Sequence, residues 1–139
     1  MTTPNGDLDP TEPIFYIEDF QKDLTPLITL MERSIAKQVA GDDDDGVLWW
    51  LEHPPLDRKM VFGVRRKWGI AIWVEHNRMF FPSGGANPED VDYFTGDGDH
   101  YPQGPHTEVP ATTAIQAVSE FTTTGTRPIC VEWVEYKPR

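Results

Sequence analysis

The 139-residue sequence predicts a single α+β domain in which two helices pack on an antiparallel sheet of about five or six strands. Two segments repeat apolar residues at helical spacing, and four short runs rich in Val, Ile, Phe and Trp lie between them. The length suits one ordinary domain, and five Trp among 38% apolar residues can fill its core. We expect residues 14–139 to form this domain, after a disordered tail at residues 1–13 that is rich in Pro, Thr and Asp.

The first predicted helix lies between Asp23 and Gly41. Its apolar residues recur at helical spacing and are Leu24, Leu27, Ile28, Met31, Ile35 and Val39. Asp23 can cap the start, Pro26 is tolerated in the first turn, and Gly41 ends the helix. Four consecutive aspartates follow at residues 42–45. They are too charged to be buried and predict an exposed loop.

Four strands are predicted next, in a segment dominated by β-branched and aromatic residues. They cover residues 47–53, 59–66, 68–75 and 78–81. The break at Arg66 and Lys67 is short enough for a hairpin, and residues 75–78 suit a second one because Asn77 tolerates positive φ. Since such short links join antiparallel neighbours, we expect a meander.

A long connection and a second helix follow the meander. Residues 83–110 are rich in Gly, Pro, Asp and His, and their brief apolar pairs, such as Val91 and Tyr93, allow one short strand. Long connections in small domains usually carry function. The helix starts near Ala111 or Thr112 and ends at Gly125. Its apolar face consists of Ala114, Ala117, Val118 and Phe121.

The last predicted strand covers residues 129–136. One face carries Ile129, Val131 and Trp133, and the other carries Cys130, Glu132, Val134 and Tyr136. Cys130 is the single cysteine and lies between apolar neighbours. We therefore expect it to pack in the core and not to act as a nucleophile.

The charge distribution indicates which partners the chain can bind. With 23 acidic and 12 basic residues the formal net charge is -11, which disfavours phosphate backbones and anionic lipid. Nucleic acid and membranes are thus excluded, and a basic macromolecule is favoured, although solubility alone also explains an acidic surface. The charges are unevenly placed: residues 79–126 hold no Lys or Arg, whereas residues 58–78 hold six of the twelve basic residues.

Two groups of side chains resemble metal ligands. The oxygen ligands of a calcium loop have counterparts in Asp90, Asp92, Asp97 and Asp99. Possible zinc ligands are His100, His106 and Glu108. The first group lacks the regular spacing and the final bidentate Glu of a calcium loop, and the second lacks the short His or Cys pairs of zinc sites. We expect neither metal.

Catalytic patterns are equally incomplete. Glu52 and His53 are adjacent strand residues that point to opposite faces, and residues 83–86 lack the Lys of a phosphate-binding loop. The five Trp suit a core better than a ligand cage. We therefore expect no enzyme and no cofactor. A small metal- or ligand-binding accessory domain remains the alternative function.

The second half of the chain carries a specific set of motifs. They are Tyr93-Phe94, Glu108-Val109-Pro110, Glu120-Phe121 and Thr124-Gly125-x-Arg127-Pro128-x-Cys130-Val131-x-Trp133. In these the segment resembles the immunity proteins numbered first among the immunity families of bacterial polymorphic toxin systems. The resemblance implies an α+β immunity protein, without catalytic residues, encoded beside its toxin. It also implies that the toxin is a zinc-dependent nucleic-acid cytidine deaminase, the usual partner in this family.

Physical reasoning supports an acidic inhibitor of such a toxin. A deaminase that acts on nucleic acid presents a positive channel and a pocket for an unstacked base. Carboxylates could occupy the channel while Tyr93 or Tyr101 enters the pocket. The candidate toxin-binding residues are Glu89, Asp90, Asp92, Tyr93, Asp97, Asp99, His100 and Tyr101, together with Asp42, Asp43, Asp44 and Asp45. Alternatively, Asp97 and Asp99 form a turn whose side chains bond their own backbone.

The expected location is the cytoplasm. No stretch is apolar enough to span a membrane, and residues 1–13 have neither a basic region nor an apolar run. A single cysteine also suits a reducing compartment.

Overall fold

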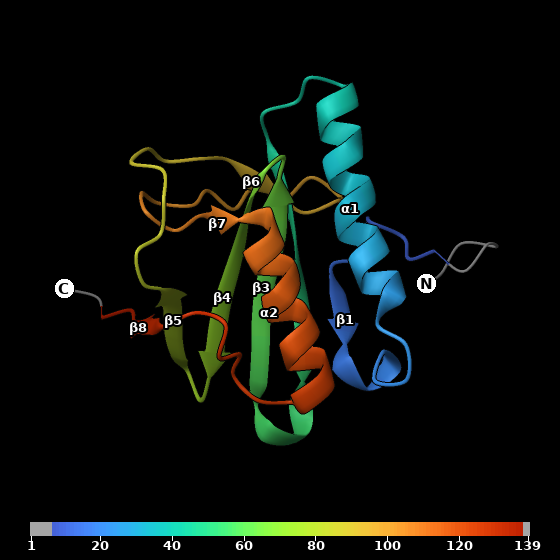
Figure 1. Ribbon diagram of the computed structural model, residues 1–139, viewed down its shortest axis with the longest axis vertical. Helices are drawn as coiled ribbons and strands as arrows, with labels where there is room; N and C mark the ends of the chain where they lie inside the picture. The colour runs from blue at the N-terminus through green and yellow to red at the C-terminus, as the bar shows by residue number, and fades with distance from the viewer. Residues whose placement is uncertain (1–6, 138–139) are drawn as a thin grey trace.

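One mixed sheet forms the centre of the computed structural model, which describes residues 7–137 (Figure 1). Its strands follow the order β1-β2-β3-β4-β5-β8, with two short strands, β6 and β7, paired to β2 and β4. Their bounds are β1 Ile14–Tyr16, β2 Gly46–His53, β3 Arg58–Arg65, β4 Trp68–Glu75, β5 Arg78–Pro82, β6 Tyr93–Phe94, β7 Val109–Pro110 and β8 Trp133–Glu135. β1 and β6 run parallel to β2, and the other pairs are antiparallel. The predicted fold class is confirmed, and β1 and β7 are additions to it.

The predicted meander is present as β2 to β5. Arg65 pairs with Trp68 across a two-residue turn, in which Arg66 takes a φ of 57°. Glu75 pairs with Arg78 across a second such turn, in which His76 and Asn77 have φ values of 51° and 63°. Two positive φ values in a two-residue turn match the twist of the flanking strands. Both predicted hairpins are confirmed.

Helix α1 (Thr25–Ala40) begins and ends close to its predicted limits. The Asp23 carboxylate accepts the Thr25 backbone N–H at 3.0 Å, and the Gly41 N–H donates to the Lys37 carbonyl. The predicted apolar face is wrong at its last position, because Val39 is 60% exposed and Gln38 is buried instead. The Gln38 amide donates to the Val64 carbonyl and accepts the Arg66 N–H, so it ties α1 to the end of β3.

Helix α2 (Ala111–Thr124) carries a small-residue face against the sheet. The four predicted apolar residues Ala114, Ala117, Val118 and Phe121 are fully buried. A Cβ on Gly69 of β4 would lie 2.8 Å from the Ala114 Cβ, so the helix and strand approach closely. Gly125 ends the helix with a φ of 70°, a conformation that glycine adopts without strain.

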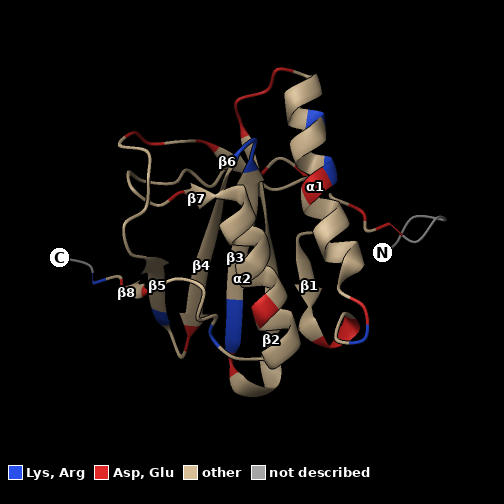
Figure 2. Ribbon diagram, in the orientation of Figure 1, with Lys and Arg blue, Asp and Glu red and all other residues tan. Residues whose placement is uncertain are grey.

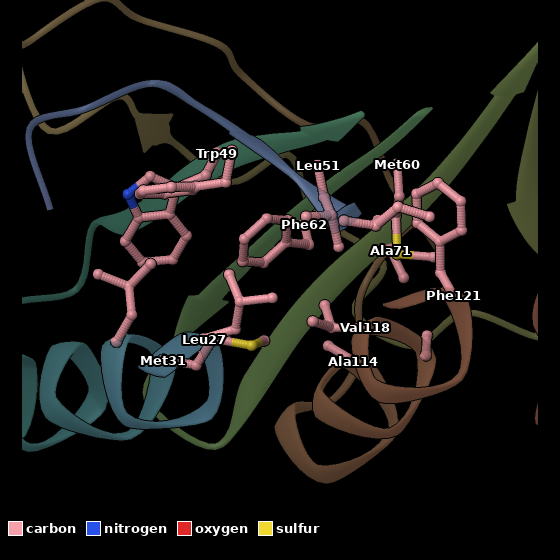
Figure 3. Packing of buried hydrophobic residues seen from close by; sticks show 14 of the residues in the cluster. Leu27, Met31, Trp49, Leu51, Met60, Phe62, Ala71, Ala114, Val118 and Phe121 are labelled. Carbon is pink, nitrogen blue, oxygen red and sulfur yellow. The ribbon is translucent and has the colours of Figure 1, made fainter. Parts of the chain in front are cut away.

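The main core lies between the two helices and one face of the sheet (Figure 3). Trp49 stands over α1, whereas Phe121 of α2 meets Trp73 edge to face at 4.8 Å between ring centroids. Trp49 and Trp73 are both fully buried in this packing. They serve as core mass and form no open aromatic cage.

The long connection between β5 and α2 packs on the other face of the sheet. Tyr93 lies over Leu48, Ile70 and Ile72, and together they form a second, smaller apolar cluster. A Cβ on Gly46 would lie 2.5 Å from the Tyr93 ring, which shows how closely the connection approaches β2. The sheet is therefore covered by helices on one side and partly by the connection on the other.

Both chain ends depart from the expected pattern. Part of the predicted tail, residues 1–6, lies outside the described residues. In the rest, Leu8 is buried, the Pro10 carbonyl accepts the Trp49 indole N–H at 3.0 Å, and the Pro13 carbonyl accepts the Trp50 N–H. The packed part of the chain thus begins at Leu8 and not at the predicted residue 14. The carbonyls of Pro10 and Pro13 hold this segment against β2, because they accept hydrogen bonds from the Trp49 indole and the Trp50 backbone.

The last strand is shorter than predicted. Ile129 was expected on an apolar face but is 91% exposed, and its backbone N–H donates to the Glu120 carboxylate at 2.8 Å. That bond holds the chain near the end of α2 and delays the strand until Trp133. Trp133 is half-buried, and its indole N–H donates to the Pro128 carbonyl at 2.7 Å.

Candidate functional site

The acidic turn at residues 95–99 is built around Thr95. The Thr95 N–H donates to the Asp99 carbonyl at 2.9 Å, the Gly98 N–H donates back to the Thr95 carbonyl at 3.0 Å, and Gly98 has a φ of 101°. The Thr95 hydroxyl donates to the Asp97 carboxylate and accepts the Asp99 N–H. The predicted turn is present, but the side-chain-to-backbone bond expected from Asp97 and Asp99 comes from the Thr95 hydroxyl instead. Asp97 and Asp99 are both exposed, which leaves their carboxylates on the surface.

Aromatic side chains flank this turn. His100 stacks on Phe94 at 4.6 Å between centroids, and its Nε2 lies 2.8 Å from the Asp92 carboxylate. Tyr101 is 40% exposed and meets Trp50 of β2 edge to face at 5.2 Å. The ring of Tyr101 is therefore held in place by a strand residue while its other side remains accessible.

A hollow of about 330 Å³ opens where the turn meets the sheet. Asp97 and Asp99 line it together with Tyr101, Trp50 and Ile14. Of the predicted site residues, the structure brings these two carboxylates and Tyr101 together. Trp50 was not among them, because strand periodicity predicts that it is half-buried but not what lies over it.

Tyr93, unlike Tyr101, is not accessible to a partner. It is fully buried, and its hydroxyl donates to the Glu108 carboxylate at 2.7 Å. Burial, followed by the nearby Glu108 charge, raises the pKa of Tyr93. As a core residue it cannot enter a partner's pocket, so the aromatic role proposed for it passes to Tyr101.

Glu108 is buried and accepts hydrogen bonds from three side chains, an arrangement here called the Glu108 hub, which the sequence did not reveal. It is 1% exposed and accepts two hydrogen bonds from the Arg65 guanidinium, at 2.8 and 2.7 Å, and one from the Asn87 amide at 2.8 Å, besides that of Tyr93. Burial by itself would raise the pKa of Glu108, but the bonds from these three donors lower it below its usual value. The hub joins β3, the connection and β7. A lone Glu directly before the apolar entry to α2 was the available signal.

The four aspartates at residues 42–45 form the predicted exposed loop between α1 and β2 (Figure 2). Arg66 binds this loop through its guanidinium, which lies 2.7 Å from the Asp42 carboxylate and 3.6 Å from the Asp44 carboxylate. The guanidinium also donates a hydrogen bond to the Asp43 carbonyl. The Asp43 carboxylate also accepts the Asp45 N–H. Part of the negative charge of the loop is thus compensated within the molecule.

The two acidic segments lie close together although about fifty residues separate them. Gly46, which follows the aspartate loop, pairs with Tyr93, and its N–H donates to the Asp92 carbonyl at 2.9 Å. Asp43 and Asp45 line a larger hollow of about 870 Å³ together with residues 94–96. The remaining candidates, Glu89 and Asp90, are exposed farther back along the connection.

Among the described residues, metal-ligating side chains do not form a group that could hold an ion, and the one thiol is poorly reactive. In that part of the chain no group of three or more His, Cys, Asp or Glu side chains could hold a metal ion. Cys130 is half-buried, and burial, followed by the charge of Glu120, raises the pKa of its thiol to about 11. A thiol with that pKa is a poor nucleophile at neutral pH. Among the same residues no helix is long and apolar enough to cross a membrane.

Comparison with known proteins identifies one family. A family model described as "Immunity protein Imm1" matches residues 17–135. The matched span contains both helices, β2 to β8 and every candidate contact residue named above. No curated protein matches the chain.

Proposed function

The chain belongs to the Imm1 family of immunity proteins, and we propose that it silences a basic, nucleic-acid-modifying toxin by covering the toxin's substrate channel. Membership makes it the immunity component of a toxin system, and such proteins generally inhibit without catalysis. The finer proposal is that the toxin is a zinc-dependent cytidine deaminase, and that the two proteins meet in the cytoplasm. The observation that carries the proposal is the group of exposed carboxylates around an accessible tyrosine at the small hollow.

Charge supports a basic partner. The net charge of -11 favours encounter with a positive surface, and nucleic-acid enzymes need such a surface to hold phosphates. Asp97 and Asp99 are exposed at the rim of the hollow, so they can meet cations that would otherwise hold phosphate groups. Arg66 already engages the aspartate loop, which makes that loop the weaker source of attraction.

The position of Tyr101 suits an anchor. Its ring rests against Trp50, so little side-chain freedom is lost when a partner covers it. An aromatic side chain in a deaminase pocket would occupy the place of a stacked base. We therefore propose that Asp92, Asp97 and Asp99 speed association with the toxin by electrostatic steering. Tyr101 slows dissociation of the complex.

Rate constants test this division of roles. The probe is the toxin domain encoded beside this gene, produced without activity and immobilised for surface binding at low and high salt. Replacing Asp92, Asp97 and Asp99 by Asn should slow association roughly tenfold at low salt and flatten its salt dependence, because exposed charges act through steering. Tyr101→Ala should instead accelerate dissociation, by roughly tenfold or more.

A matched control removes three negative charges elsewhere. Glu18, Asp19 and Glu32 are exposed, and the triple variant Glu18→Gln, Asp19→Asn, Glu32→Gln has the same net charge as the first triple variant. It should change association by less than about threefold. Equal effects of the two triple variants would show that net charge alone matters. If C-to-U conversion is absent when the active toxin meets DNA or RNA, the deaminase assignment is wrong while inhibition itself stands.

Of the alternative function, a metal- or ligand-binding accessory domain, the metal-binding form has no group of three or more His, Cys, Asp or Glu side chains among the described residues to support it. The single-domain organisation stays a proposal too, and limited proteolysis that leaves one resistant fragment from about residue 7 onward would support it.

A further inference from the structure

The face of the sheet opposite the helices carries two rows of side chains, here called the outer face. Strand register, continued by one pair from Trp73–Phe80 to Ile72–Phe81, places one residue from each of the six main strands in the first row. The second row takes one residue from each of β1 to β5 and ends on the residue after β8. The first row is Ile14, Trp50, Val61, Ile72, Phe81 and Val134. The second row is Tyr16, Glu52, Lys59, Val74, Met79 and Tyr136, where Tyr136 extends the ladder by donating its N–H to the Met79 carbonyl.

The outer face is apolar, buried at Ile72, half-buried at Trp50, Val61, Val74 and Phe81, and exposed toward its two sides. Apart from Glu52 and Lys59, every position in the two rows is aliphatic or aromatic. Toward the two sides of the sheet, on β1, β5 and β8 and directly after β8, Ile14, Tyr16, Met79, Val134 and Tyr136 are between 38% and 55% exposed. Neighbouring strand residues on the opposite side belong to the main core, so this exposure is confined to one face.

The long connection covers only the adjoining part of this surface. Tyr93 packs on Leu48 and Ile70, one pleat beyond the first row, and on Ile72 within it, while Tyr101 reaches Trp50. Within the described part of the chain, no helix lies on the outer face (Figure 1). Six strands at about 4.8 Å spacing span roughly 24 Å, which is of the order of the width of a standard protein interface.

Charge decides between two kinds of occupant. A second copy of this chain would bring another net charge of -11 against the first, with Asp97 and Asp99 at the rim of both faces. Like charges placed opposite each other cost several kcal/mol. A basic partner would instead be attracted by the carboxylates at that rim. The two apolar rows would supply the water-excluding centre that protein interfaces need.

We propose that the outer face is the main contact surface for the toxin, with the hollow at Tyr101 as its acidic margin. This inference rests on the proposed function, since it names the surface through which that function acts. A contact here would extend from β1 across to β8. Most of the binding free energy would then come from strand residues outside the acidic connection.

Arginine substitutions in the second row, one on β1 and one on β5, test the surface. Tyr16→Arg and Met79→Arg place a cation on exposed positions where a basic partner would be repelled. Each should weaken the equilibrium affinity for the inactive toxin domain by tenfold or more. Ile129→Arg is the matched control, because Ile129 is 91% exposed and its backbone is held beside α2, away from the outer face. It should change the affinity by less than about twofold.

A second measurement uses the wild-type protein and does not depend on how variants fold. Hydroxyl-radical oxidation of Met79 and Tyr136 should slow severalfold in the complex, while oxidation of Ile129 should not change. Slower oxidation of the first two residues, together with weaker binding of both arginine variants, would support the outer face.

Other outcomes overturn the inference in distinguishable ways. If wild-type protein binds but both variants bind equally well and Met79 stays reactive, the contact lies elsewhere and only this inference fails. If wild-type protein does not bind the toxin domain, the proposed function fails and this inference fails with it. If light scattering shows a wild-type dimer that Met79→Arg dissociates, the occupant is a second copy of the chain.

Discussion

Replacing Glu108 by Ala should destabilise the protein by about 3 kcal/mol, because it leaves a buried cation without its partner. Glu108 is 1% exposed, and the Arg65 side chain that donates two hydrogen bonds to it is 15% exposed. Removing one member of a buried ion pair typically costs about 3 to 5 kcal/mol. The residual exposure of Arg65 places the expected value at the lower end, since water can reach part of the guanidinium.

Differential scanning calorimetry provides the measurement. For a domain of this size, about 3 kcal/mol corresponds to a fall in Tm of roughly 10 °C. Glu89→Ala is the control, because Glu89 is an exposed carboxylate of the same connection, and its loss should change stability by less than about 0.5 kcal/mol. A Glu108→Ala protein that melts within a degree or two of wild type would refute the view that this hub holds the connection against the sheet.

Titration gives an independent check on the same hub. Burial pushes the pKa of Glu108 upward, but the hydrogen bonds from Arg65, Asn87 and Tyr93 outweigh it and lower the pKa below the ordinary 4.5. A carboxylate with a lowered pKa stabilises the fold fully above the unfolded-state value and loses that contribution as pH falls through the folded-state value. The stability gap between wild type and Glu108→Gln should therefore be constant near neutral pH and narrow below about pH 4.5. A gap that widens with acid would contradict the assignment.

Three further predictions follow from the same structure. Trp133→Ala should lower the free energy of unfolding, measured in urea, by about 2 kcal/mol. The loss is smaller than for a fully buried Trp because the ring is half-buried, with its indole N–H donated to the Pro128 carbonyl. A soluble variant of unchanged stability would contradict this. The Cys130 thiol, with its pKa raised to about 11, should react with a disulfide reagent at pH 7.5 at least tenfold more slowly in the folded than in the unfolded protein. A strong chelator should shift the Tm by less than about 1 °C, and a shift of many degrees would revive the metal-binding alternative.

Local patterns in the sequence predicted most of the elements. α1, α2 and the meander β2 to β5 depend on periods of 3.6 and 2 residues and on tight turns, and these are set by neighbours along the chain. The bounds predicted for β4, residues 68–75, agree with the structure because its apolar run is flanked by two short turns. Val39 shows the limit of periodicity: Gln38, whose amide hydrogen-bonds to Val64 of β3 and to Arg66 of the β3–β4 turn, takes the inward position that the pattern assigned to an apolar residue.

Contacts distant along the chain explain what was missed. β1 exists because β2 offers it a parallel partner, and the loop before it is held by carbonyls that accept from Trp49 and Trp50. A three-residue strand has too little pattern to be predicted alone. For the candidate site, the exposed acidic residues could be predicted from their charge, whereas the contribution of Trp50 could not.

The net charge, its uneven placement, the two helices, the meander and the immunity-family motifs can all be predicted from the amino-acid sequence. Which tyrosine of the connection is accessible depends on contacts that form only in the folded protein. Tyr93 is buried because β6 pairs with β2 and its hydroxyl donates to Glu108, whereas Tyr101, eight residues later, meets Trp50 edge to face and stays 40% exposed. The physical reason is that burial depends on partners such as Arg65, which meets Glu108 across 43 residues of chain, and a local pattern carries no information about such partners.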